Sequence, residues 1–146
     1  MFAASAFCQT EQKNGTIYIK HPYIDVVNNE VKAYLSNNPD GIKYYADTAK
    51  FWINGMDKPI SVSEAFKIFS GHFITYDDIK MEQVGYPDYL HYIDRDSKIV
   101  QSWWKWSGKS KKTGQMVSLD CVKFDEFNKD GKIVFEGLYG DFSKME

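Results

Sequence analysis

The pattern of hydrophobic and polar residues predicts three long strands near the end of the chain, at residues 98–109, 115–127 and 132–142. A loop rich in Lys, Ser and Gly joins the first two, and Asp130-Gly131 joins the last two. Both residues of that pair tolerate the positive φ angles that a tight primed turn requires. The sequence therefore predicts two consecutive hairpins, which together form a β-meander.

Two earlier stretches have the hydrophobic spacing of helices. The first begins at Pro22, which suits the first helical position, and ends before Asn37-Asn38-Pro39. Its apolar stripe consists of Ile24, Val27, Val31, Tyr34 and Leu35. The second begins at the capping-box pattern Ser61-Val62-Ser63-Glu64, and its apolar face consists of Ala65, Phe66, Ile68, Phe69 and Phe73.

Further strands are predicted at residues 42–54, 79–85 and 89–94. The order of elements is thus helix, strand, helix and then a run of antiparallel strands. Helices grouped before an antiparallel sheet indicate an α+β fold, with the helices packed on one face of a curved sheet. We expect the stripe of the first helix to lie on the concave side.

Residues 1–20 differ from the rest of the chain. Ala4-Ser5-Ala6 has the small-x-small pattern of a signal-peptidase site, although the basic region and most of the apolar region of a signal are missing. We interpret residues 1–20 as a leader or signal-peptide remnant with a short strand at 16–19, and residues 21–146 as a single domain. The location stays open: periplasmic or secreted if this segment is such a remnant, and otherwise cytoplasmic.

Composition narrows the classes of function. A chain of 146 residues suits one domain that needs no disulfide or metal to hold its core together. The net charge of −2 argues against general nucleic-acid binding, and no run approaches the roughly 18 apolar residues that span a bilayer. The basic loop at Lys109, Lys111 and Lys112 is typical of a solvated hairpin tip. Aromatic residues make up 16% of the chain, which indicates a large apolar face or a cavity to line.

Several motifs carry a family resemblance. They are Tyr45-Ala46-Asp47, the Trp-rich stretch 100–108, Thr113-Gly114, the stretch 127–134 and Tyr139-Gly140-Asp141. With the order of elements, they resemble the nuclear-transport-factor-2-like superfamily, and within it the SnoaL-like branch that includes polyketide cyclases and ketosteroid isomerases. The resemblance covers about residues 22–142 and implies a cone-shaped, strongly curved, mainly antiparallel sheet with helices on its concave face, the cystatin-like roll. Such cones host isomerases, cyclases, dehydratases, immunity proteins and binding modules, so the resemblance implies a fold more firmly than a reaction.

A pair of aspartates is the predicted catalytic site. A two-residue turn at Asp130-Gly131 would place Val122 opposite Tyr139 and Asp120 opposite Asp141. The resemblance implies that this face is the inside of the cone, where isomerases carry a protonated aspartate and cyclases an acid/base aspartate. Inward carboxyl groups there would have a raised pKa, which suits acid/base chemistry. Alternatively, Asp141 sits at a wet strand end and Asp120 pairs with a nearby Lys or Tyr.

The resemblance fails at two other positions. The isomerase base follows the first strand and a tyrosine partner lies on the first helix, whereas this chain offers residues 51–54 and Glu30 there. An isomerase mechanism of that specific kind is therefore not expected. Tyr34, one turn further along the helix, could reach the same space or could be an ordinary core tyrosine.

The tryptophan strand has two faces. Trp104 and Trp106 share one of them and can line a pocket or fill the core, whereas Trp103 lies on the other. An outward Trp103 flanked by polar residues favours an interface, and the resemblance implies a homodimer through the sheet. The predicted ligand-binding residues are Tyr34, His91, Trp104, Trp106, Phe124 and Tyr139.

Two hypotheses of different classes remain. In the first, the protein binds a small apolar molecule in the cone and carries out cofactor-free acid/base chemistry of the isomerase, cyclase or lyase type. In the second, it is a non-catalytic, dimeric interaction or ligand-binding module, exported if the leader is real. The three histidines lack metal-ligand spacing, and no phosphate loop, nucleophile elbow or dinucleotide fingerprint occurs, so no metal or cofactor is expected. Whether the protein is an enzyme stays open.

Overall fold

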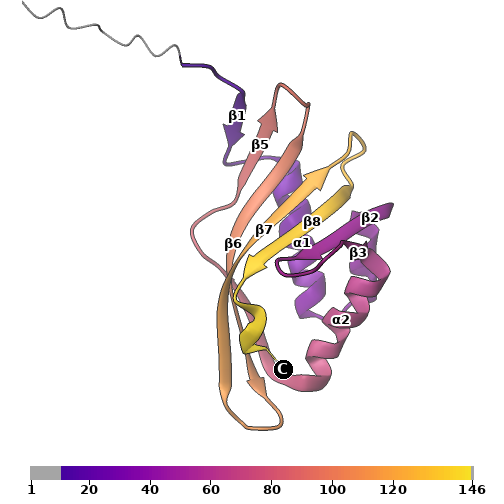
Figure 1. Ribbon diagram of the computed structural model, residues 1–146, viewed down its shortest axis with the longest axis vertical. Coiled ribbons are helices and arrows are strands. Elements are labelled where there is room, and N and C mark those ends of the chain that lie inside the picture. Colours follow the sequence, from indigo (N-terminus) through magenta and orange to yellow (C-terminus); the bar gives the residue numbers. More distant parts are fainter. Residues whose placement is uncertain (1–10, 146) are drawn as a thin grey trace, which may run out of the picture.

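The structure is a computed structural model that describes residues 11–145 (Figure 1). The predicted cleavage pattern Ala4-Ser5-Ala6 lies outside these residues. The elements are β1 Gly15–Tyr18, α1 Pro22–Leu35, η1 Pro39–Tyr44, β2 Tyr45–Ile53, β3 Ile60–Ser61, α2 Val62–Thr75, β4 Tyr76–Gln83, β5 Asp88–Tyr92, β6 Lys98–Ser110, β7 Met116–Phe127, β8 Ile133–Gly140 and η2 Phe142–Lys144. None of the helices in this range is long and apolar enough to cross a membrane.

Both helices form where their local signals predict them. The imidazole of His21 caps α1 by accepting a hydrogen bond from the Tyr23 backbone N–H, and Pro22 opens the helix. The capping box of α2 is complete, because the Ser61 hydroxyl accepts from the Glu64 N–H and the Glu64 carboxylate accepts from the Ser61 N–H. Each cap satisfies backbone donors that a free helix end would leave without partners.

The strands form one mixed sheet in the order β1-β5-β6-β7-β8-β2-β3, with β4 paired to the far half of β6. All pairs are antiparallel except β2 with β8. Figure 1 shows both helices on the same side of the bent sheet, which does not close into a barrel. The predicted α+β class and the nearly all-antiparallel sheet are confirmed.

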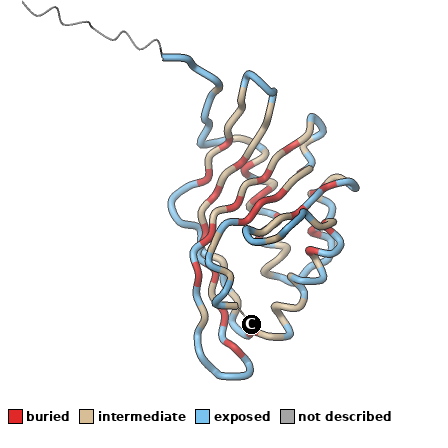
Figure 2. Tube along the Cα trace, viewed as in Figure 1, coloured by how far each residue is buried: buried red, intermediate tan, exposed pale blue. Residues whose placement is uncertain are grey.

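The core lies between the helices and the concave face. On α1, Ile24, Val27 and Val31 are buried, as the stripe predicted. Ile24 and Val27 pack in one cluster with Val100, Phe127 and Ile133, whereas Val31 packs with Trp104, Trp106, Leu119 and Cys121. Figure 2 shows the resulting alternation of buried and less buried residues along β6, β7 and β8, and the exposed tip where β6 turns into β7.

The predicted register of the last hairpin is right, but the predicted face is wrong. Val122 does pair with Tyr139, and Phe124 with Gly137. These side chains lie on the outer face of the sheet, however, because the buried positions of β7 are Leu119, Cys121, Lys123, Asp125 and Phe127. The turn is also longer than two residues, since the Asn128 N–H donates to the Lys132 carbonyl and a bulge next to Phe127 restores the register.

Candidate functional site

A cavity of about 290 Å³ lies between α1, α2 and the concave face of the sheet. Its apolar lining consists of Val31, Ile53, Ile68, Phe69, Met81, Leu119, Leu138, Phe142 and Met145. Its polar lining consists of Glu30, Tyr34, His72, Trp106, Cys121, Lys123 and Glu136. Since a cavity of about 150 Å³ can hold a benzene ring, this one suits a molecule of about two fused rings.

The two ends of the cavity differ in burial. Ile68 on α2 is 42% exposed and belongs to its rim. Glu30, Lys123 and Glu136 are buried and form a charged floor. An apolar wall with a few convergent polar groups is the usual composition of a small-molecule site.

The floor is a cluster of three carboxyl groups around one ammonium. Lys123 Nζ lies 2.6 Å from Asp125 Oδ1, 2.9 Å from Glu136 Oε2 and 3.1 Å from Glu30 Oε2. None of these four residues exposes more than 4% of its surface. The buried Tyr45 hydroxyl donates a hydrogen bond to Glu136 Oε2.

Local structure brings these groups together. Asp125 on β7 pairs directly with Glu136 on β8, and Lys123 precedes Asp125 by two residues on the same face. Glu30 lies one turn after Val27 on the buried stripe of α1, which aims it at the sheet. The cluster therefore ties α1 to two neighbouring strands.

Burial and charge shift the pKa values of the cluster. Burial raises the pKa of Glu30 and of Asp125, with the ammonium of Lys123 opposing the shift in both cases. Burial alone would lower the pKa of Lys123, but Asp125, Glu136 and Glu30 together raise it well above its usual value. Lys123 therefore stays charged. Glu30, which lines the cavity, is a carboxyl group able to hold a proton above its ordinary pKa.

A second polar group stands on the helix side of the cavity. Trp106 Nε1 donates to the Tyr34 hydroxyl over 2.8 Å, and that hydroxyl lies 2.9 Å from His72 Nδ1. Because an indole N–H can only donate, the Tyr34 hydrogen is free to go to Nδ1, which assigns the remaining hydrogen of neutral His72 to Nε2. Burial lowers the pKa of His72, in agreement with the neutral form. Burial also raises the pKa of the Cys121 thiol to about 11, so this thiol is not an activated nucleophile.

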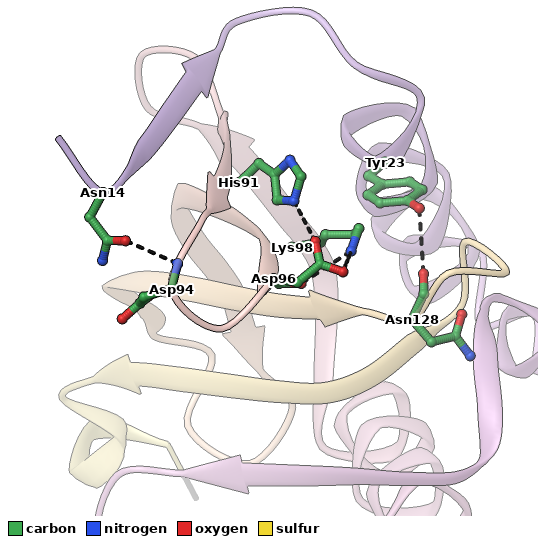
Figure 3. A network of polar contacts seen from close by, with 7 residues as sticks. All are labelled: Asn14, Tyr23, His91, Asp94, Asp96, Lys98 and Asn128. Atoms are coloured by element: carbon green, nitrogen blue, oxygen red, sulfur yellow. Dashed lines mark hydrogen bonds and ion pairs between the residues drawn. The ribbon is translucent and has the colours of Figure 1, made fainter.

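The structure separates the six predicted ligand-binding residues. Tyr34 and Trp106 line the cavity, and Trp104 is buried beside Ser102 without reaching it. Phe124 and Tyr139 lie on the outer face in a shallow depression. The prediction that His91 faces the cavity is wrong, because its Nε2 lies 2.6 Å from Asp96 Oδ1 near the turn after β5, where Lys98 also contacts Asp96 (Figure 3).

The predicted inward pair of aspartates is wrong as well. Asp120 is exposed, and the pairing of β7 with β8 ends at Cys121 and Gly140, so Asp141 is not held opposite it. Asp141 instead precedes η2 and accepts a hydrogen bond of 2.5 Å from the Ser143 hydroxyl. That bond lowers the pKa of Asp141, whereas a raised pKa was expected. The alternative of a wet strand end holds for Asp141.

Sequence reasoning missed Lys123, Asp125 and Glu136 and gave Glu30 no role. A signal was available for Glu30, since it occupies a position of the apolar stripe between Val27 and Tyr34. A charged residue within such a stripe is expected to be buried together with a partner of opposite charge. For the strand residues the alternation pattern alone did not indicate which face is covered.

Comparisons with known proteins bear on the fold. No family model matches the sequence, and no curated protein matches it significantly. Solved structures do match. A protein described as a SnoaL-like polyketide cyclase from Jannaschia is 11% identical, with 92% of this chain and 93% of that chain covered and a TM-score of 0.67. An NTF2-like protein from Burkholderia thailandensis is 17% identical, with 84% and 92% covered and a TM-score of 0.65. PrhC from Penicillium brasilianum is 8% identical, with 87% and 85% covered and a TM-score of 0.69. At such identities the likeness concerns the fold.

Proposed function

Because this chain has the nuclear-transport-factor-2-like fold, as its resemblance implied, we propose that it binds a small, mostly apolar molecule in its cavity. The observation that carries the proposal is the apolar cavity of about 290 Å³ with Glu30, Lys123 and Glu136 at its floor. The fold itself decides no reaction, since one scaffold hosts many functions.

Cofactor-free acid/base chemistry is the second part of the proposal. A carboxyl group whose pKa is raised by burial can give a proton near neutral pH, and its ionised form is a stronger base than an ordinary carboxylate. Glu30 combines that environment with a place in the cavity wall. Glu30 would exchange the proton, and the neighbouring Lys123 ammonium would stabilise its carboxylate form.

The binding test uses a library of apolar molecules of about two fused rings, followed by thermal shift, because a ligand bound only by the native state raises the melting temperature. Ile68→Trp fills the rim of the cavity, and Ile74→Trp is the matched control on the exposed side of the same helix. We expect Ile68→Trp to lose the shift and Ile74→Trp to keep it. A ligand that binds both variants equally is not in this cavity.

The acid/base test uses 2-tetralone, an enolisable ketone of two fused rings. We expect the protein to speed the exchange of its acidic C–H hydrogens for deuterium, measured by NMR in D₂O, and Glu30→Gln to remove that acceleration. Equal exchange with both proteins would contradict the role of Glu30 and leave the binding proposal standing.

A second candidate function rests on the outer face of the sheet. Its depression is lined mainly by apolar side chains: Ile99, Val122, Phe124, Glu126, Phe135, Gly137 and Tyr139. Tyr139 is 49% exposed, and Trp103 lies next to Val122 on the same face. Apolar patches of this kind mark interaction surfaces, and a second copy of the chain is the partner that we propose.

Light scattering tests the homodimer. We expect a dimer for the wild-type protein and a monomer for Phe124→Glu, which puts a charge in the middle of the patch. Ser118→Glu, an exposed position of β7 outside the depression, is the control and should stay dimeric. A wild-type protein that is monomeric at high concentration would exclude this candidate.

A further inference from the structure

We propose that the cavity selects ligands that carry a protonated amine on an apolar body, with the ammonium group bound by Glu30. This inference rests on the proposed function as a small-molecule binding protein and names the class of molecule. Three features of the cavity support it: the charge count of the floor, a buried acceptor atom without a donor, and the aromatic walls.

The charge count favours a cation. Three carboxyl groups surround one ammonium, and of the residues that line the cavity only Lys123 belongs to the Lys and Arg class. His72 is the other basic group of the lining, and it is neutral at pH 7 because burial lowers its pKa. An anionic ligand would find one ammonium group that three carboxyl groups already surround, whereas a cationic ligand can take the place of the proton that burial favours on Glu30.

Two buried carboxylate oxygens of the cluster, Glu30 Oε2 and Asp125 Oδ2, lack a hydrogen-bond donor within the described residues, and of these two residues Glu30 is the one that lines the cavity. Within the described residues, Glu30 Oε2 accepts no hydrogen bond, although Glu30 is only 4% exposed and lines the cavity. Lys123 Nζ lies 3.1 Å from Glu30 Oε2 and is shared with Asp125 Oδ1 at 2.6 Å and Glu136 Oε2 at 2.9 Å, so its contact with Glu30 is the longest of the three. A buried acceptor without a donor costs free energy, and an N–H group of a ligand would remove that cost.

The walls suit a cation with an apolar body. The lining includes the rings of Tyr34, Phe69, Trp106 and Phe142. Aromatic faces attract ammonium groups electrostatically, and the effect grows where water is excluded. The aliphatic lining from Val31 to Leu138 then holds the rest of the molecule.

Binding should also release a proton. The groups that face Glu30 are Lys123 and Asp125 on β7, Glu136 on β8, Tyr45 on β2 and Tyr34 on α1. Where Glu30 holds a proton, pairing with an ammonium ion R–NH₃⁺ from water sends that proton to the solvent: R–NH₃⁺ plus Glu30–COOH gives the pair R–NH₃⁺ with ⁻OOC–Glu30, plus H⁺. A second cation near the carboxyl group lowers its pKa, which drives this release.

The test compares three molecules that differ only in the charged group: 2-naphthylmethylamine, 2-naphthylmethanol and 2-naphthoate. Isothermal titration calorimetry at pH 7 should show the amine binding at least about tenfold more tightly than the alcohol, and no binding of the carboxylate. Repeating the amine titration in buffers with different ionisation enthalpies should show the release of up to about one proton per ligand.

Glu30→Gln removes the charge and keeps the shape. We expect it to lower the affinity for the amine to that of the alcohol, to leave the alcohol unchanged and to abolish the proton release. Asp120→Asn, which removes an exposed carboxyl group from the outer face, is the control and should change nothing. If Glu30→Gln does not fold, the comparison of the amine, the alcohol and the carboxylate on the wild-type protein still decides whether the cavity prefers an amine.

The outcomes separate this inference from the proposed function. Binding of the alcohol or the carboxylate as tightly as the amine would overturn the amine preference and leave the binding site in place. Failure of all three molecules to bind would overturn both. Amine binding with undiminished affinity in Glu30→Gln would overturn the role of Glu30.

Discussion

Replacing Lys123 by Met tests whether the buried cluster is held together as the distances indicate. The change removes the ammonium group that lies within 3.1 Å of three carboxyl groups. Removing one partner of a buried ion pair costs about 3–5 kcal/mol, because the remaining charge is left uncompensated. For a chain of about 150 residues each kcal/mol corresponds to roughly 2–4 °C, so we expect the melting temperature to fall by roughly 6–20 °C at pH 7.

The loss should shrink as the pH falls. Burial already raises the pKa of Glu30 and Asp125 in the folded protein, and without Lys123 nothing opposes that rise. Unfolded carboxyl groups keep pKa values of about 4. Below that pH both states hold their protons. As the pH rises above it, the unfolded chain releases protons that the folded variant retains, and the folded state loses stability. Lys123→Met should therefore lose more stability at pH 7 than at pH 5.

The assay is urea unfolding of the wild type and of Lys123→Met at pH 5 and pH 7. Lys105→Met makes the same chemical change at an exposed position of β6 and should stay within about 0.5 kcal/mol of the wild type at both values. A Lys123→Met protein that matches the wild type at pH 7, or whose deficit is the same at both pH values, would refute the reasoning.

Three smaller predictions concern single sites and use thermal unfolding. Gly108→Ala should cost roughly 1–3 kcal/mol, because the added Cβ would meet a ring carbon of Trp106 at 2.8 Å; Gly71→Ala, with open space in α2, should instead stabilise by about 0.5–1 kcal/mol. Tyr34→Phe should cost about 1–3 kcal/mol, because it leaves the Trp106 N–H without its acceptor. Asp141→Asn should slightly destabilise at pH 7, because the lowered pKa of Asp141 means that its carboxylate stabilises the folded state above the pKa of an unfolded Asp; the effect should decrease as the pH falls through the folded-state pKa.

Local signals in the sequence were sufficient to predict the two α-helices and the order of the longer strands. The cap at His21 and Pro22 and the capping box at Ser61 are complete within a few residues, so no distant contact is needed to predict them. Strand ends were less accurate. The stretch expected to begin a strand at residue 42 starts as η1, and β4 follows α2 directly at Tyr76. Where a strand begins and ends depends on tertiary packing, and a short stretch of sequence does not contain that information.

The candidate site was predicted wrongly because of one step, the choice of which face of the β7–β8 hairpin points toward the helices. A period of two says which side chains share a face, and a shift of one residue exchanges the two faces completely. Trp104 and Trp106 were expected to share a face that lines a pocket or fills the core, and both are buried. Trp104 pairs with Cys121, so once the tryptophans face inward, Lys123 must as well.

That deduction needed the register between β6 and β7. The connecting residues 111–115 form a longer loop with Gly114 at a φ of 72°. A loop of that kind allows either the odd-numbered or the even-numbered residues of β7 to share a face with Trp104 and Trp106. The register between β7 and β8 across Asp130-Gly131 could be predicted, but the register between β7 and the tryptophan strand β6 could not. The family resemblance then favoured the wrong face, whereas Lys123, Asp125 and Glu136 are the buried residues of the opposite one. Together, the ammonium of Lys123 and the carboxyl groups offset one another's charge, and charged side chains are buried only when they are paired in this way. To predict which face of the last hairpin points toward the helices, one must therefore ask whether charged residues on neighbouring strands can neutralise one another.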